Sequence, residues 1–310
     1  MEYTHKPVLL DECLDGLNIR PDGVYVDGTL GRAGHSLEIV KRLTTGRLIA
    51  IDRDKAALDA APARLAGHMD KVALVRGNFG DLRDILASLG VDRVDGMLFD
   101  LGVSSPQLDD GSRGFSYLQD APLDMRMDQS ALLTAREVVN GWSQEELKRI
   151  LWQYGEERYA GPIAAAIVRE RERAPIETTG RLAELIRAAM PAKARREKQH
   201  PAKRSFQAIR IAVNDELGEV ERLLDAALDA LNPGGRVAII AFHSLEDRLV
   251  KTAYAGWSKG CTCPPDFPVC VCGRTPKAKL VGRRPITAGE GEVNENPRAR
   301  SAKLRIAEKL

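Results

Sequence analysis

Short apolar runs alternate with helical patterns over the N-terminal third of the chain. The runs cover residues 24–26, 48–51, 72–75 and 94–99, and apolar residues at helical spacing follow them, as at Leu37, Val40 and Leu43. Continuous apolar runs of this length are typical of parallel strands that are buried on both faces. The pattern therefore predicts an α/β fold with a doubly wound, mostly parallel sheet.

The next strand of this sheet comes late in the chain. Residues 236–242 are the best candidate, and they follow a turn at 232–235 and a helical pattern. A strand-helix-strand crossover takes about 30 residues, far fewer than separate Leu101 from Gly235. We therefore expect three segments: a first part of the main domain at 1–108, an inserted domain at 109–204, and a second part at 205–310.

The expected insertion reads as helical. Thr134 with Glu137, and Ser143 with Glu146, fit the capping box in which a hydroxyl and a carboxylate satisfy the first backbone N–H groups of a helix. Residues 111–129 have no clean period and are expected to form an ordered loop. Beyond the insertion, 280–286 and 301–307 read as the last two strands, the final one antiparallel.

A glycine-rich turn follows the first predicted strand. Gly28, Gly31 and Gly34 recur between that strand and a helical pattern that begins at Ser36. Glycines let a backbone approach a ligand closely, and a helix N-terminus offers N–H groups that lack partners. The turn is thus interpreted as a cradle for a nucleotide-like cofactor, with an ordinary tight turn as the alternative, because the spacing is GxxGxxG and not GxGxxG.

Acidic residues end three of the predicted strands. Asp27, Asp52 and Asp100 would lie on the edge formed by the strands' carboxyl ends, where open α/β sheets bind ligands. Asp52 is placed to hold ribose hydroxyls, with Asp54 as a competitor and a solvated strand end as the alternative. Phe79 stands where an adenine ring could lie against it, or is a core residue.

His243 follows the late strand. It is interpreted either as a contact to substrate or cofactor or as a structural hydrogen-bonding residue at the strand end.

A basic run lies near the end of the insertion. Its six cations are Lys193, Arg195, Arg196, Lys198, Lys203 and Arg204, set against the single acid Glu197. The net charge of the whole chain is only +2, so a polyanion site has to come from such local clustering. The run could grip a phosphate backbone, with a merely solvated surface as the alternative.

Four of the five cysteines stand close together near the C-terminus. Cys261, Cys263, Cys270 and Cys272 form two CxC pairs. Four thiolates in a short loop suit tetrahedral zinc, and thiols or oxidation-prone pairs are the alternative. The loop at 261–272 is expected to be peripheral to the chemistry.

Composition narrows the class of protein. Hydrophobic residues make up 44% and charged residues 29% of the 310 positions, which is typical of a globular protein. The first twenty residues are interrupted by charges and contain no apolar signal core, and no apolar run approaches the roughly 18 residues of a membrane span. We expect a cytoplasmic protein in which disulfides are disfavoured.

The combined motifs resemble one known family over essentially the whole chain. They stand at 5–10, 27–36, 100–109, 122–128, 154–158, 206–214, 242–248 and 296–301. These stretches are similar to the ribosomal small-subunit RNA methyltransferase H family, also called MraW. The resemblance implies an S-adenosylmethionine-dependent enzyme that methylates N4 of a cytidine in 16S rRNA near the decoding centre. It also implies a seven-stranded, Rossmann-like class I methyltransferase domain with a helical insertion, and the small ribosomal subunit as the setting of the substrate.

The resemblance implies cofactor contacts at seven residues of this chain. They are Ala33, Gly34, His35, Asp52, Phe79, Asp100 and Gln107. Many relatives have glycine where this chain has Arg32 and Ala33. A cofactor therefore has less room to approach the backbone here. The cysteine loop does not define the family, so the zinc interpretation gains nothing from the resemblance.

Asp100 is the candidate catalytic residue. It, or a backbone carbonyl in 101–104, is expected to accept hydrogen bonds from the cytosine amine as charge develops there. Familiar amino-methyltransferases carry an Asp/Asn-Pro-Pro-aromatic turn at this place, and Asp100-Leu101-Gly102-Val103 departs from it. Two other functions share features of the chain: an NAD-dependent oxidoreductase and a non-catalytic RNA-binding assembly factor.

Overall fold

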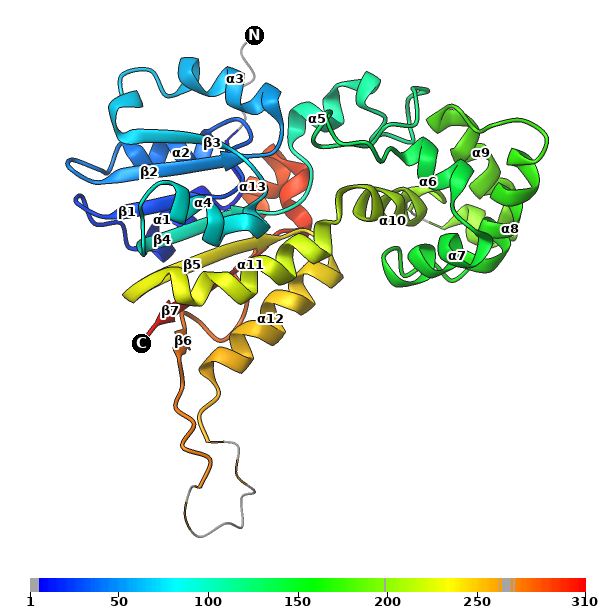
Figure 1. Cartoon of the computed structure of the whole chain (residues 1–310). Coiled ribbons are helices and arrows are strands. Elements are labelled where there is room, and N and C mark those ends of the chain that lie inside the picture. Colours follow the sequence, from blue (N-terminus) through cyan, green and yellow to red (C-terminus); the bar gives the residue numbers. More distant parts are fainter. Residues whose placement is uncertain (1–5, 198, 262, 264–268, 270) are drawn as a thin grey trace. The chain divides into compact units, whose positions relative to one another are not determined.

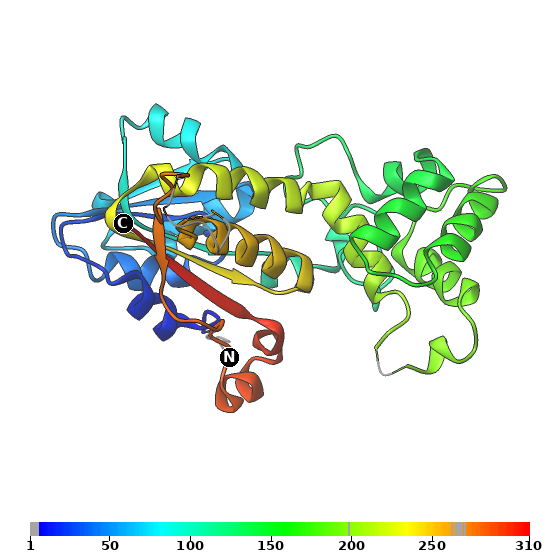
Figure 2. The same ribbon diagram turned by 90° about the horizontal axis from the view of Figure 1, so that it is seen from below.

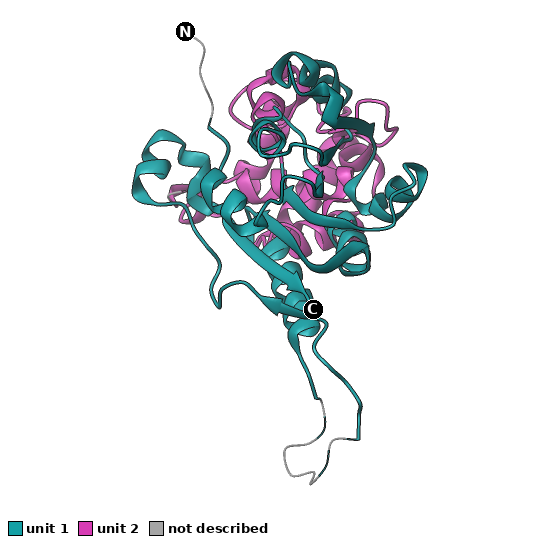
Figure 3. Ribbon diagram, turned by 90° about the vertical axis from the view of Figure 1, so that its left-hand side faces the viewer, with its two compact units in different colours: residues 1–102, 217–310 teal, residues 103–216 magenta. Residues whose placement is uncertain are grey.

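The chain folds as two compact units. The computed structural model describes residues 6–197, 199–261, 263, 269 and 271–310. Unit 1 comprises residues 1–102 and 217–310, and unit 2 comprises residues 103–216 (Figure 3). Unit 2 extends beyond the predicted insertion, 109–204, at both of its ends.

Unit 1 is built on a seven-stranded sheet (Figure 1). Its strands are β1 (Val24–Asp27), β2 (Arg47–Asp52), β3 (Val72–Arg76), β4 (Val94–Asp100), β5 (Leu231–Ala241), β6 (Ala278–Leu280) and β7 (Lys303–Lys309). The order is β3-β2-β1-β4-β5-β7-β6. The first five strands pair in parallel, while β7 is antiparallel to both β5 and β6. The predicted α/β fold with a doubly wound, mostly parallel, seven-stranded sheet is confirmed.

Helices cover both faces of this sheet. They are α1 (Leu10–Leu17), α2 (Gly34–Val40), α3 (Lys55–Arg64), α4 (Leu82–Ser88), α11 (Glu216–Ala230), α12 (Ser244–Ser258) and α13 (Glu290–Glu295), with 3₁₀ turns η1 (Met69–Lys71), η2 (Phe79–Asp81) and η5 (Pro297–Ser301). Along β2, Leu48 and Ala50 join the core under α1, α2 and α3, while Ile49 and Ile51 join the core under α4, α11 and α12. Figure 2 shows α11 and α12 lying along the sheet. Burial on both faces explains why these strands read as unbroken apolar runs.

The C-terminal strands differ from their predicted bounds. The strand expected at 280–286 ends at Leu280, because Gly282 adopts a φ of +92° that no regular strand continues. Ile286 makes only an isolated bridge to Leu304. The final strand is antiparallel, as predicted.

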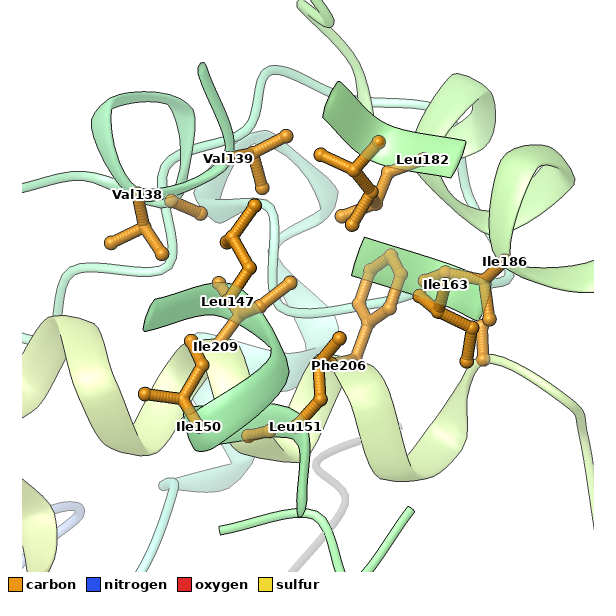
Figure 4. Close-up of a cluster of buried hydrophobic side chains, with 14 of the residues drawn as sticks. Val138, Val139, Leu147, Ile150, Leu151, Ile163, Leu182, Ile186, Phe206 and Ile209 are labelled. Carbon is orange, nitrogen blue, oxygen red and sulfur yellow. The ribbon is translucent and has the colours of Figure 1, made fainter. Parts of the chain in front are cut away.

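Unit 2 is helical. Its helices are α5 (Ser105–Asp109), α6 (Ala135–Gly141), α7 (Gln144–Gln153), α8 (Ala160–Arg171), α9 (Thr179–Ala189) and α10 (Lys203–Asn214), with 3₁₀ turns η3 (Gly111–Arg113) and η4 (Ala194–Arg196). Both predicted capping boxes are present, at the starts of α6 and α7. Figure 4 shows the core that these helices share, with side chains such as Leu147, Ile163 and Phe206 packed together.

A long irregular segment is tied to the end of α10. The backbone N–H of Met127 donates to Oδ1 of Asn214 at 2.7 Å, and Nδ2 of Asn214 donates to the carbonyl of Met125 at 2.7 Å. Arg113 is buried and donates to the carbonyls of Arg126 and Met127. These contacts between distant residues carry unit 2 past the predicted boundary at 204.

The helices of both units differ from membrane spans. Over the part of the chain that the structure describes, no helix combines the length and the apolar character needed to cross a membrane.

The start of the glycine turn allows a direct test of packing. A Cβ atom at Gly28 would lie 2.1 Å from Cε1 of Phe99, whose ring is fully buried. We expect Gly28→Ala to lower the free energy of unfolding by about 1–3 kcal/mol, because overpacking displaces a fixed ring. Urea denaturation measures this.

Gly256→Ala in α12 is the matched control. A Cβ there meets nothing within 4 Å, so the change should stabilise the helix by about 0.5–1 kcal/mol. An unchanged unfolding midpoint for Gly28→Ala would contradict the assigned packing.

Candidate functional site

Three aspartates gather at one edge of the sheet. β1 lies between β2 and β4, all three strands are parallel, and they end at Asp27, Asp52 and Asp100. The carboxyl ends of parallel strands meet at the same edge. The structure thus brings together the three acids that the sequence placed there.

The glycine turn is held to the strands on either side of it. The N–H of Gly28 donates to the carbonyl of Leu98 at 2.9 Å, and that of Leu30 donates to the carbonyl of Ile51 at 3.0 Å. Gly31 has a φ of +49°, a left-handed conformation that suits glycine. Ala33 adopts φ +57° just before α2, which begins at Gly34 and not at Ser36 as predicted. The turn is therefore fixed in place before any ligand binds.

The side chain of Asp27 holds this turn in place through hydrogen bonds. Its side chain is buried, Oδ2 accepts from the hydroxyl of Ser36 at 2.6 Å, and Oδ1 accepts from the N–H of Thr29 at 3.1 Å. Burial raises the pKa of Asp27 above its ordinary value, although the hydrogen bond from Ser36 opposes that shift. The hydroxyl of Thr29 then accepts from the N–H of Asp100 at 2.6 Å. One hydrogen-bonded chain thus joins α2, β1 and β4.

Asp52 is oriented by backbone donors. Its Oδ2 accepts from the N–H of Gly31 at 2.8 Å and its Oδ1 accepts from the N–H of Asp54 at 2.8 Å. A carboxylate has about four acceptor positions, so two hydroxyls can still bind it. Asp54, the competitor, is buried and caps α3 by accepting from the N–H of Ala56. Of the two aspartates, Asp52 is the one left available to a ligand.

Asp100 carries the unusual carboxyl group of the site. Its Oδ1 is buried and has no hydrogen-bond partner among the described residues. Desolvation, assisted by the negative charges of Asp27 and Glu246, raises the pKa of Asp100 to about 8. A buried acceptor without a partner costs free energy that a ligand can recover by donating to it or by bringing a positive charge.

His35 faces Asp100 without forming an ion pair with it. Nε2 of His35 lies 3.1 Å from the carbonyl of Val8 and must donate to it, so Nδ1 carries a lone pair. That Nδ1 lies 4.0 Å from Oδ2 of Asp100. Burial lowers the pKa of His35 to about 4, so the ring is neutral near pH 7. The neutral imidazole therefore does not stabilise the carboxylate form of Asp100.

Phe79 stands next to this edge in η2, at the end of β3. Its ring is half-buried and meets Phe99 edge to face, with ring centroids 5.9 Å apart. The guanidinium of Arg53 lies 5.9 Å from the centroid of the Phe79 ring. The ring thus belongs to the core on one side, and its predicted contact with adenine stays a prediction.

Gln107 lies in unit 2 and has a structural partner. Its Oε1 accepts from the N–H of Ser104 at 3.0 Å and completes a capping box at the start of α5. His243 likewise forms the N-cap of α12, where its side chain accepts from the N–H of Glu246. This is the structural role proposed for His243, while its Nε2 is buried with no hydrogen-bond partner among the described residues, so its predicted contact with substrate or cofactor stays a prediction.

The basic run lies on the surface of unit 2. Lys193, Arg195, Arg196 and Lys203 are exposed, at η4 and the start of α10. Arg204 is half-buried and donates to the carbonyl of Glu156 at 3.3 Å. Lys198 and Cys270 fall outside the described residues. Cys261 and Cys263 follow α12, and Cys272 precedes β6.

The family model that describes the MraW methylase family matches residues 2–310. The chain belongs to the MraW methylase family.

Curated relatives agree with this assignment. A protein of Brevibacillus brevis called ribosomal RNA small subunit methyltransferase H is 58% identical over 311 residues, covering 100% of this chain and 99% of the relative. One of the same name from a Paenibacillus species is 59% identical, covering 99% of this chain and 100% of the relative. Among solved structures, a putative rRNA-methylase of Clostridium thermocellum superposes with a TM-score of 0.46 at 11% identity, covering 99% of this chain and 100% of the other.

Two residues of this MraW-family site were missed by sequence reasoning. Thr29 and Ser36 connect Asp27 to Asp100 and to α2. A hydroxyl two residues after a strand-ending acid, and another at the start of the following helix, were the available signal. Sequence reasoning also passed over Trp152 in unit 2, which is 61% exposed on α7 and lies off the helix's buried face of Leu147, Ile150 and Leu151. Helical spacing could have shown this.

The raised pKa of Asp100 predicts a pH dependence of stability. Between about pH 4 and pH 8 the folded protein holds a proton on Asp100 that the unfolded chain has lost, so the free energy of unfolding should fall as pH rises through this window. The side chain of Asp100→Asn cannot ionise, so the free energy of unfolding of this variant should lack this pH-dependent fall. Urea denaturation at several pH values compares the two proteins.

Asp92→Asn, at an exposed carboxyl of unit 1, removes the same charge and is the control. Parallel stability curves for wild type and Asp100→Asn would contradict the assignment of a protonated Asp100.

Proposed function

We propose that this MraW-family chain transfers the methyl group of S-adenosylmethionine to N4 of a cytidine in 16S rRNA, near the decoding centre. The observation that carries the proposal is the buried carboxyl oxygen of Asp100, which has no partner among the described residues. The printed names of the relatives support the RNA substrate, since they are called small-subunit ribosomal RNA methyltransferases. The proposal places the protein in the cytoplasm, with 16S rRNA of the small subunit as its partner.

The residues at the sheet edge fit this cofactor. Asp52 is held by Gly31 and Asp54 so that its remaining acceptor positions can bind two ribose hydroxyls. Ala33 is the N-cap of α2, which begins with Gly34 and His35, and Nδ1 of His35 lies 4.0 Å from Oδ2 of Asp100. Phe79 offers a half-buried ring for the adenine. Gln107 completes the proposed set of cofactor contacts.

Charge also favours this cofactor. When bound, S-adenosylmethionine supplies a methyl group on a positively charged sulfonium. Among the described residues His35 is the ionisable base nearest to the carboxyl of Asp100 in the ion-pair distances, and its ring is neutral near pH 7. A cationic ligand would stabilise the carboxylate form of Asp100 and lower its pKa.

Asp100 has the properties that the reaction requires of an acceptor. The N4 amine of cytosine is a weak nucleophile because its lone pair is delocalised into the ring. The carboxylate of Asp100 would orient the amine by accepting an N–H hydrogen bond, and would accept a proton as the amine gains positive charge. Carbonyls of residues 101–104 are the alternative acceptors. The hydrogen bond from the Asp100 N–H to Thr29 fixes the backbone at this point.

Unit 2 is proposed to hold the RNA strand. The exposed cations Lys193, Arg195, Arg196 and Lys203 cluster at η4 and the start of α10, and Arg204 and Lys198 extend the run. An RNA base has to leave its stack before an enzyme can reach it. Trp152, exposed on the same unit, offers a surface on which a base could stack.

Loss of the Asp100 carboxyl tests the mechanism. We expect Asp100→Ala to lower the rate of methyl transfer by about 10²- to 10⁴-fold, while S-adenosylhomocysteine still raises the melting temperature. Mass mapping of 16S rRNA after incubation with each protein, as free RNA and as small subunits, measures the product and its position.

Asp92→Asn is the control for net charge and should keep full activity. Retained activity in Asp100→Ala would remove the side chain from the mechanism and favour the backbone carbonyls. Stabilisation by NAD and not by S-adenosylhomocysteine would indicate an oxidoreductase.

Charge reversal tests the RNA surface. We expect Arg195→Glu with Arg196→Glu to weaken RNA binding and to lower the salt dependence of binding, by about 0.7 in log–log slope for each phosphate that the variant no longer neutralises. Arg64→Glu with Arg93→Glu changes the net charge equally at two exposed arginines of unit 1. Equal RNA affinity for the two double variants would refute the assignment of this surface.

A further inference from the structure

Three cysteine thiols come together between α12 and β6. The sulfur atoms of Cys261, Cys263 and Cys272 all lie within 4.8 Å of one another. The Sγ atoms of Cys261 and Cys272 are 3.7 Å apart, although eleven positions separate these residues along the chain. The sulfur atoms thus converge from the two ends of a loop.

The separation of 3.7 Å between Cys261 and Cys272 is that of sulfur ligands around one metal ion. In a tetrahedral site with Zn–S bonds of about 2.3 Å, neighbouring sulfurs lie about 3.8 Å apart. A disulfide would require about 2.05 Å and would involve only two of the three thiols. The observed spacing of Cys261 and Cys272 fits the first arrangement.

Backbone donors point at two of the sulfurs. The N–H of Cys263 donates to Sγ of Cys261 at 3.4 Å, and the N–H of Val271 donates to Sγ of Cys263 at 3.4 Å. Such donors around metal-binding thiolates orient them and stabilise their negative charge. These two backbone N–H groups therefore lie at the sulfurs as they would at a metal site.

Hydrophobic burial does not explain this convergence. Cys261 and Cys272 are exposed, Cys263 is only half-buried, and the neighbouring side chains of Val269 and Val271 are 70% and 73% exposed. The described parts of the segment extend away from the sheet and its helices (Figure 1). A cross-link is the physical means by which such a small, exposed element keeps one conformation.

The base of the loop is already closed. The N–H of Lys277 donates to the carbonyl of Trp257 at the end of α12, at 2.8 Å, and the N–H of Leu310 donates to the carbonyl of Lys277 at 3.0 Å. The chain therefore leaves and rejoins unit 1 at neighbouring points. A metal bound by Cys261, Cys263 and Cys272 would close the same loop a second time, farther from the sheet.

We propose that Cys261, Cys263 and Cys272 bind one zinc ion, which holds the loop between α12 and β6 in a fixed conformation. The three thiols lose their protons to solvent as the metal binds. Thiolate ligands in tetrahedral geometry select zinc over hard cations such as magnesium. Cys270 lies outside the described residues, and the proposal depends on the three cysteines that are described.

Metal analysis of the purified full-length protein tests the proposal. We expect about one zinc per chain, and much less than one in Cys261→Ser and in Cys272→Ser. Cys13→Ser is the matched control, because Cys13 is buried in α1, away from this loop in sequence, and its replacement should leave the zinc content unchanged. Cobalt in place of zinc should give the charge-transfer absorption of thiolate ligands.

A second measurement uses the wild-type chain alone. Removal of zinc with a chelator should expose additional thiols to a thiol reagent and make the loop more sensitive to protease, and zinc should restore protection. The proposal is overturned if the protein contains no zinc, if iron and sulfide are found in its place, if Cys13→Ser loses zinc equally, or if the cysteines are isolated as a disulfide.

Discussion

The carboxylate of Asp27 is the constraint on which the site depends. Buried beneath the glycine turn, it accepts from Ser36 at the start of α2 and from the backbone of Thr29. The hydroxyl of Thr29 in turn accepts from the backbone of Asp100. Because each link is a hydrogen bond between neighbouring elements of the sheet edge, the position of Asp100 follows from the burial of Asp27.

Burying these carboxyl groups costs electrostatic free energy. Three carboxyl groups lie on adjacent strand ends, and burial raises the pKa of each. Asp27 and Asp52 recover part of this cost through backbone and hydroxyl donors, whereas Oδ1 of Asp100 has none among the described residues. Functional sites commonly keep such a local conflict, which binding of the right ligand relieves. A cationic ligand at Asp100 fits this pattern.

The sequence predicted the parts of the fold that depend on local pattern. Apolar runs predicted the parallel strands, and the spacing of Thr134 and Glu137 predicted a capped helix. Both features depend on residues that are neighbours in the chain. The extent of unit 2 was not predictable, since it depends on Asn214 meeting the backbone of Met127. The role of Asp54 as the cap of α3 likewise became visible only in the structure, and the ribose contact of Asp52 stays a prediction.

Calorimetry of ligand binding in buffers of different ionisation enthalpy tests the role of Asp100 most directly, because it counts the protons released. Near pH 7 the account predicts that S-adenosylmethionine releases close to one proton more from the wild type than from Asp100→Asn. S-adenosylhomocysteine, which has no positive charge on sulfur, should show no such difference. Equal proton release from both proteins with S-adenosylmethionine would contradict the account.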